Sequence, residues 1–318
     1  MTTVYPHPRR FLPSLLILLL PAALMFVGCS ETQSSTTFCG QQPPGLEPVP
    51  FAPDMLTAKI RPHGPLCISP DLSLLCFSGY RIGEGRNETV YEAACDGTSL
   101  KPPVRMPFAG DNGFGPSAFS RDGNMLFLGT TLVLPGDPEG LNLCVWQVER
   151  RADGWSDLAP VSVTHDTAWL AMRPSLARNG NLYFVARYKN ERQPKIYCSK
   201  LVDGAFSTPV PLNDKINATP SADPFVDPDE RFLLFLGDHR PDGLGKSDLY
   251  VSFRTDDGDW GDPINLGPKI NTAEFERSPS LSPDGKYLFF IRAVGRMFVE
   301  ADAQYYWVSA EILDSLRP

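Results

Sequence analysis

The chain has few of the features that mark enzymes or nucleic-acid-binding proteins. It carries a formal net charge of −8 over 318 residues, and its basic residues form no stripe that would hold a phosphate backbone. A nucleophile elbow, a Walker loop, an HExxH motif and a Gly-rich dinucleotide fingerprint are all missing. We therefore expect no nucleic-acid partner, no cofactor and no catalytic residue of these classes.

Residues with the spacing of metal ligands are also scarce. No two cysteines have the CxxC spacing of zinc sites, so we expect no metal centre. The four histidines are spread over the whole chain, at His7, His63, His165 and His239.

The apolar run near the N-terminus is too short for a comfortable membrane-spanning helix. Arg9 and Arg10 precede this run, which extends from Leu15 to Val27 and is interrupted by Pro21. A charged segment, then an apolar segment, then a small residue at a cleavage point is typical of a signal peptide. We predict such a peptide over residues 1–28.

The segment FVGC at the end of the run resembles the bacterial lipobox, in which a small residue precedes a Cys that is lipidated and becomes the new N-terminus. The resemblance implies a lipid anchor on Cys29, whereas in an ordinary secretory signal Cys29 would be incidental. The polar residues that follow predict a tether over residues 29–44. We thus expect a bacterial envelope protein, lipid-anchored to a membrane, whose folded part faces the periplasm or the exterior.

An exported chain can form disulfides, and six cysteines remain if Cys29 carries the lipid. Their spacing selects no particular pairing. They are Cys39, Cys67, Cys76, Cys95, Cys144 and Cys198.

One motif recurs along the chain, and it is clearest in SPSLSPDGKYLFF at residues 278–290. Its Asp or Asn recurs at spacings of 51, 57, 50 and 55 residues, with an apolar residue three positions before it and an apolar block after it. This pattern predicts a β-hairpin in which the Asp or Asn caps its own turn. The five positions are Asp71, Asp122, Asn179, Asp229 and Asp284.

The rest of each unit predicts two more strands. The block after the turn is apolar on both faces, so each sheet should be packed between two like sheets. A third β-rich stretch follows, such as KIYCS or DLYVS, and then a Pro before a β-branched residue, as in FSTPVPL and WGDPINL. Because proline belongs on edge strands, this fourth strand should be outermost. Four strands per repeat predict an all-β fold, a β-propeller.

The fifth unit lacks its fourth strand, and the missing signature appears near the N-terminus as EPVPF, from Glu47 to Phe51. We infer that this N-terminal strand completes the last blade and closes the ring, which removes an open edge. The prediction is five four-stranded blades over residues 45–318, with six blades as the alternative if Ala52 to Pro65 holds further structure.

The units SPSLSPDGKYLFF and GDHRPDGLGKSDLYVSFRTDDGDWGDPINLG resemble the WD40-like repeats of TolB-type bacterial β-propellers. The similarity spans about residues 45–318 and is strongest in the last two units, since ISPDLS lacks the Gly and LARNG lacks both Pro and Asp. It implies the propeller architecture and an exported or envelope location. This family has no common catalytic residues that could be carried over.

Four carboxylates each lie shortly before the innermost strand of a different blade. They could converge at the mouth of the central channel, as the acids of five-bladed glycosidases do. The opposing interpretation treats them as solvated loop residues, and their unequal offsets and the single nearby Trp169 favour it. The four are Asp111, Asp166, Asp223 and Glu276.

The function that we predict is binding rather than catalysis. A monomeric propeller would bind or scaffold an envelope protein or a glycan through its loops. The alternative is a carbohydrate-active hydrolase or lyase that uses the channel-mouth carboxylates.

Overall fold

The computed structural model describes residues 1–3, 37–84, 88–108, 114–130, 144–161, 163, 169–188, 193–295 and 302–317. The chain divides into two units, Met1–Ser34 and Ser35–Pro318, and the second contains all the described strands and helical segments. The predicted signal peptide beyond residue 3 and the predicted lipid-bearing Cys29 lie outside the described residues. None of the described helical segments has the length and apolar character that crossing a bilayer requires.

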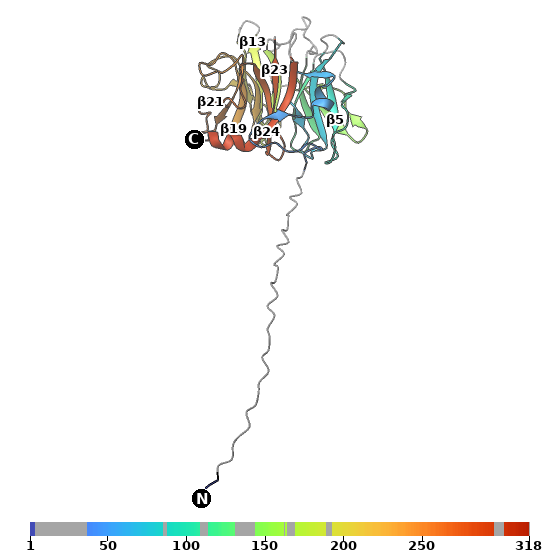
Figure 1. Ribbon diagram of the computed structural model, residues 1–318. Helices are drawn as coiled ribbons and strands as arrows, with labels where there is room; N and C mark the ends of the chain where they lie inside the picture. The colour runs from blue at the N-terminus through green and yellow to red at the C-terminus, as the bar shows by residue number, and fades with distance from the viewer. Residues whose placement is uncertain are drawn as a thin grey trace. The chain divides into compact units, whose positions relative to one another are not determined.

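The second unit is a five-bladed β-propeller, which confirms the predicted fold class (Figure 1). Each blade is an antiparallel sheet whose innermost strand comes first in its repeat. Blade 1 contains β2 (Ile60–Pro62) and β3 (Cys67–Ile68), which both pair with β4 (Leu74–Arg81), and then β5 (Glu88–Ala94) and β6 (Val104–Arg105). Blade 2 contains β7 (Phe114–Phe119), β8 (Met125–Thr130) and β9 (Cys144–Arg151), with β10 (Gly154–Trp155) and β11 (Ala159–Pro160) both paired with β9.

The remaining blades follow the same order from the axis outward. Blade 3 contains β12 (Trp169–Leu176), β13 (Leu182–Tyr188), β14 (Lys195–Ser199) and β17 (Val210–Pro211), with a small hairpin of β15 (Leu201–Val202) and β16 (Ala205–Phe206) before β17. Blade 4 contains β18 (Ser221–Val226), β19 (Phe232–Gly237), β20 (Asp248–Phe253) and β21 (Ile264–Asn265). Blade 5 contains β22 (Phe275–Leu281), β23 (Tyr287–Val294), β24 (Asp302–Ser309) and β1 (Val49–Pro50). Two short helical segments, η1 (Pro53–Thr57) and η2 (Ala310–Leu316), flank the ring closure.

The hydrophobic core lies between the blades rather than inside one central cluster. Buried side chains form five clusters, and each cluster joins two neighbouring blades. Between blades 4 and 5, for example, Leu234 and Val251 lie with Leu288 and Phe290. The second strands are apolar on both faces because both faces are covered, as the sequence predicts.

The repeated motif forms the hairpin between the first and second strands of every blade. In blade 5, Gly285 N donates to Ser282 O at 2.8 Å, and Asp284 Oδ1 accepts from Ser282 Oγ at 2.6 Å and from Lys286 N at 3.2 Å. The predicted capping role is confirmed there. In three other blades, the side chains of Asp71, Asp122 and Asn179 likewise accept a hydrogen bond from the backbone N–H two residues later.

The turn of blade 4 is an exception, and the predicted capping role of Asp229 is wrong. Asp229 forms an ion pair with Arg178 of blade 3. The turn N–H groups of Asp229 and Arg231 instead donate to Asp227, at 3.1 Å and 3.2 Å. Asp227 stands where the other turns have Ser or Ala, and its longer carboxylate reaches the turn backbone.

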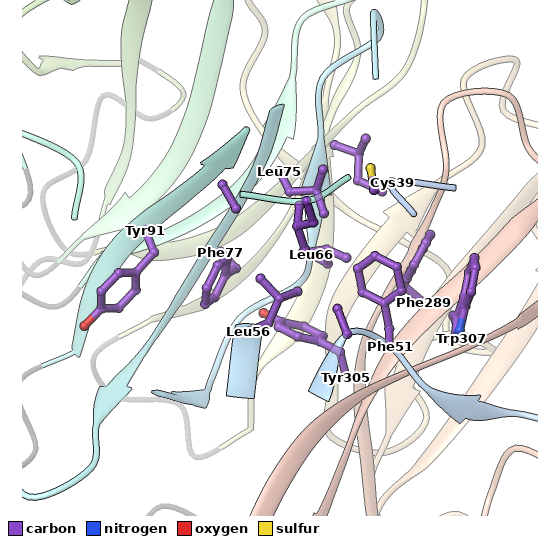
Figure 2. Close-up of a cluster of buried hydrophobic side chains, with 14 of the residues drawn as sticks. Cys39, Phe51, Leu56, Leu66, Leu75, Phe77, Tyr91, Phe289, Tyr305 and Trp307 are labelled. Atoms are coloured by element: carbon purple, nitrogen blue, oxygen red, sulfur yellow. The ribbon is translucent and has the colours of Figure 1, made fainter. Parts of the chain in front are cut away.

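The N-terminal strand closes the ring, as predicted. Val49 and Pro50 of β1 pair with Trp307 and Tyr306 of β24, so the last blade is completed by the start of the folded unit. Phe51 follows β1 and is fully buried, with its ring 5.0 Å from that of Phe289 and 5.1 Å from that of Trp307. Figure 2 shows these three rings together in the cluster between blades 5 and 1.

A disulfide fixes the segment upstream of β1. Cys39 is bonded to Cys95 of blade 1, with a Cα–Cα distance of 5.4 Å, and Phe38 packs beside it against Phe289 and Trp307. The packed unit therefore includes Phe38 to Gln41, which lie in the stretch predicted as tether. Among the described cysteines, Cys67, Cys76 and Cys198 are free thiols.

We predict that Cys95→Ser destabilises the oxidised protein by up to about 4 kcal/mol, because the disulfide closes a long loop in the unfolded chain. The measurement is the urea midpoint with and without reductant. Reductant should lower the midpoint of the unmodified protein to that of the variant and leave the variant unchanged. Cys198→Ser is the matched control and should keep the reductant-sensitive midpoint. Equal midpoints for Cys95→Ser and the unmodified protein in oxidising buffer would refute the prediction.

Candidate functional site

The central axis is lined by an X-Pro dipeptide from the inner strand of every blade. In blades 3 to 5 the dipeptide is a β-bulge, because the register of β12, β18 and β22 shifts across it. In blade 1 it separates β2 from β3, and in blade 2 the register shifts directly after the proline. The five residues that precede the prolines are Gly64, Gly115, Arg173, Asp223 and Ser278.

Three of these residues adopt a backbone conformation that L-amino acids seldom use. The φ angles of Arg173, Asp223 and Ser278 are 56°, 49° and 55°. Such positive values cost free energy for a residue with a side chain, and they persist only where surrounding contacts hold them. The bulges therefore aim three different polar side chains at one point on the axis.

Arg173 spans the channel. Its Nε lies 3.4 Å from Asp223 Oδ1 in blade 4, and its Nη2 donates to His63 O in blade 1 at 3.3 Å. The two glycines give it room, since a Cβ atom on Gly64 or Gly115 would lie 2.7 or 2.9 Å from Nη1. Small residues in blades 1 and 2 thus accommodate one large cation from blade 3.

Polar contacts extend from Arg173 through the neighbouring blades. His63 Nδ1 lies 2.9 Å from Glu88 Oε1, which also accepts from Ser78 Oγ at 2.6 Å. Asp223 Oδ2 accepts from Ser278 N at 3.0 Å and from its hydroxyl at 2.8 Å. These bonds join blades 1, 3, 4 and 5 around the axis.

Burial sets the protonation of His63. Desolvation lowers the pKa of His63 below its usual value, and the nearby guanidinium of Arg173 acts in the same direction, against the carboxylate of Glu88. Burial alone would raise the pKa of Glu88, but the bond to His63 and the charge of Arg173 outweigh it and the pKa is lowered. The network at neutral pH therefore contains an ionised Glu88 and a neutral His63.

Both candidate acids that the structure describes are engaged in ion pairs. Glu276 is fully buried in β22, where Oε1 lies 2.8 Å from Arg292 Nε and accepts from the Thr272 hydroxyl at 2.7 Å. Asp223 is held by Arg173 and Ser278, as above. The two lie within inner strands rather than in the loops before them. Asp111 and Asp166 lie outside the described residues.

A funnel opens along the axis at the end of the ring where the hairpin turns lie. Its volume is about 1060 Å³, and its wall comes from the inner strands and turns of all five blades together with η2. Half-buried apolar side chains line it, one from each of blades 2 to 5: Phe119, Leu176, Phe225 and Leu281.

The funnel ends at the ring of X-Pro dipeptides. The space at that level is about 10 Å³ and is lined by Arg173, Asp223 and prolines of four blades. It shares Ser117 and Phe225 with the funnel wall, so the two spaces adjoin. A ligand in the funnel would therefore meet a closed end, since this space holds about one water molecule.

The X-Pro dipeptides are visible in the sequence, but the contacts that they form across the axis are not. Gly-Pro, Gly-Pro, Arg-Pro, Asp-Pro and Ser-Pro recur six or seven residues before the Asp or Asn of the turn. A Pro within a strand signals a bulge or an edge, which would have located the ring. Arg173 contacts blade 1 because the two blades are close across the axis. A repeat pattern in the sequence does not predict that distance.

We predict that Gly115→Ala destabilises the fold by about 1–3 kcal/mol, the usual cost of overpacking, because the new methyl group would displace the Arg173 guanidinium. The urea midpoint measures this. Gly45→Ala is the matched control, since a Cβ there has no heavy atom within 4 Å, and it should leave the midpoint unchanged. A Gly115→Ala midpoint equal to that of the control would show that Arg173 does not need the space.

Comparison with family models and with curated proteins finds no match to the chain. Among solved structures, an endo-arabinase from Bacteroides thetaiotaomicron is similar at 14% identity and a TM-score of 0.51, over 78% of this chain and 93% of that one. A glycoside hydrolase is similar at 10% identity and a TM-score of 0.51, over 83% and 91% of the two chains. A protein assigned as TolB from Agrobacterium tumefaciens gives 18% identity and a TM-score of 0.43, over 76% and 72%. At these identities the similarity is one of fold, and the chain has the fold of a five-bladed β-propeller.

Proposed function

We propose that the protein is an exported binding module, anchored through lipid on Cys29, that holds a ligand on its propeller without chemical change. The observation that carries this proposal is the state of Asp223 and Glu276, whose carboxylates are both committed to arginine. A wide funnel, whose wall contains neither of these carboxylates, stays accessible. Such a scaffold presents a rigid, concave surface, which suits binding.

Catalysis by Asp223 and Glu276 would conflict with their bonds. Glycoside hydrolysis needs one carboxyl group that gives its proton to the leaving group and another that acts as a base or nucleophile. Glu276 makes three polar contacts, to Arg292 and to the backbone and hydroxyl of Thr272, and none of its side chain is exposed. A sugar could reach it only after this ion pair had broken, which is costly for buried charges.

A carbohydrate-active enzyme is the second candidate, and one observation favours it. The endo-arabinase and the glycoside hydrolase share this fold. The carboxylates of Asp111 and Asp166 are the remaining candidates for the acid and the base, and both precede inner strands. Similarity of fold alone does not assign a reaction, so we favour the binding function over the enzymatic one.

Hydrolysis assays and stability measurements separate the two candidates. We predict that the purified protein releases no reducing sugar from arabinan or polygalacturonate. We also predict that Glu276→Gln lowers the free energy of unfolding by about 3 kcal/mol, because Arg292 loses its buried partner. The exposed Asp256→Asn is the matched control and should change neither quantity. Sugar release that Glu276→Gln abolishes while the urea midpoint stays constant would establish the enzyme instead.

The anchor is tested separately. We predict that cells expressing the protein incorporate labelled palmitate into it, and that Cys29→Ser abolishes the label because no thiol remains at the predicted cleavage point. Cys198→Ser should be labelled normally. Persistent labelling of Cys29→Ser would exclude lipid at this residue and leave an ordinary secretory signal.

A further inference from the structure

We infer that Cys67 and Cys76 form a binding site for a soft monovalent metal cation, Cu(I), between blades 1 and 2. The two residues pair directly across the hairpin of blade 1, with Cys67 on β3 and Cys76 on β4. Paired residues of an antiparallel sheet point to the same face, so the two thiols lie side by side. The site is separate from the binding function proposed above and does not depend on it.

The spacing of these cysteines in the sequence does not reveal the site. They stand nine positions apart, so the CxxC spacing that marks zinc sites is absent, and only the pairing of β3 with β4 brings them together. In the part of the chain that the structure describes, no group of three or more His, Cys, Asp and Glu side chains could hold a metal ion. The pair therefore suits a metal that needs only two ligands.

The geometry of the hairpin fits one metal ion between two sulfur atoms. The Cβ atoms of directly opposite residues lie about 4.5–5.5 Å apart. Two metal–sulfur bonds of about 2.3 Å each span about 4.6 Å in a line. The turn beyond the pair is fixed, because Ser69 N donates to Leu74 O at 2.9 Å and Leu74 N donates to Ser69 Oγ at 3.0 Å. The two thiols are thus held ready for a linear metal site while the strands stay paired.

The surroundings of the pair favour a soft cation. Cys67 is 5% exposed and Cys76 is fully buried, in the cluster that joins blades 1 and 2. The nearest strand contributes one carboxylate, Glu92, and its Oε2 accepts from Trp155 Nε1 at 2.9 Å. Sulfur ligands select Cu(I), whereas Mg²⁺ and Ca²⁺ need several oxygen atoms and structural Zn²⁺ needs four ligands. The apolar members of the cluster include Leu74, Val90, Leu126, Leu128 and Val148.

Metal binding must displace the thiol protons, which leave to solvent as two sulfur–copper bonds form. Burial raises the pKa of both thiols, and at Cys76 the neighbouring Cys67 and Glu92 act in the same direction. Two groups of blade 2 oppose this effect on the pKa, the backbone N–H of Phe119 at Cys67 and the charge of Arg150 at Cys76. These two groups would stabilise the thiolates in the complex. A cation that binds sulfur strongly is needed to overcome the cost of burial, which again favours Cu(I).

The axial funnel gives the site an entrance. Cys67 belongs to the funnel wall, whose volume of about 1060 Å³ admits a hydrated ion or a small copper complex. A cation that meets Cys67 from the funnel then needs only the neighbouring thiol of Cys76 to complete its coordination.

The test is a titration of the full chain with Cu(I) under argon and without thiol reductant, in competition with the chelator bathocuproine disulfonate. We expect each chain to withdraw one Cu(I) from the coloured chelator complex. Cys67→Ser and Cys76→Ser should each lose this ability, because one of only two metal bonds is removed. Cys198→Ser removes a free thiol of blade 3, is the matched control and should retain Cu(I) as the unmodified protein does.

Two further measurements do not depend on how the serine variants fold. X-ray absorption at the copper edge of the loaded, unmodified protein should show two sulfur neighbours. Nitrogen or oxygen neighbours, or retention of Cu(I) by both Cys67→Ser and Cys76→Ser, would overturn the site. Peptide mapping of the freshly purified protein should recover Cys67 and Cys76 as thiols, and a mass lower by two hydrogen atoms in a linked pair would show a disulfide there instead. Uptake of Zn²⁺ in place of Cu(I) would overturn the choice of a soft monovalent cation.

Discussion

Closure of the ring is the constraint on which the rest of the structure depends. Five sheets can pack in a circle only if the last blade is complete, and the last blade takes its outer strand from the N-terminal side of the first. That strand, β1, has two residues, so backbone pairing alone holds it weakly. Phe51 compensates by inserting between Phe289 and Trp307, and the Cys39–Cys95 disulfide holds the segment before it. The buried cluster between blades 5 and 1 is built on this seam.

Within the closed ring, one position of the inner strand carries different chemistry in blades 3, 4 and 5. The residue before the inner-strand proline is Gly in blades 1 and 2, and Arg173, Asp223 and Ser278 in the others. Fivefold geometry brings these positions together, so a single cation, its anionic partner and the space for the cation are distributed over four blades. The repeated sequence specifies the five blades, and the residues that differ between repeats form the polar contacts at the axis.

The sequence predicts most of the fold and little of the site. Hairpins, blade count and ring closure follow from local patterns, since Asp284 caps its own turn and EPVPF repeats the outer-strand signature. The spacing of the cysteines could not select Cys39 and Cys95, because they meet only once the ring has closed. Asp229 forms an ion pair with Arg178 of another blade, and Glu276 forms one with Arg292 on the next strand. Contacts of this kind depend on the length and direction of individual side chains, so they produce no periodic pattern in the sequence.

The position of the disulfide decides how the propeller responds to mechanical load. A pull on the chain before Cys39 passes through the sulfur bridge into blade 1 at Cys95. The intervening segment, which includes β1 and Phe51, lies inside the covalent loop and carries none of that force. The weakest strand of the ring is thus shielded from tension, and reduction of one bond would transfer the whole load to it.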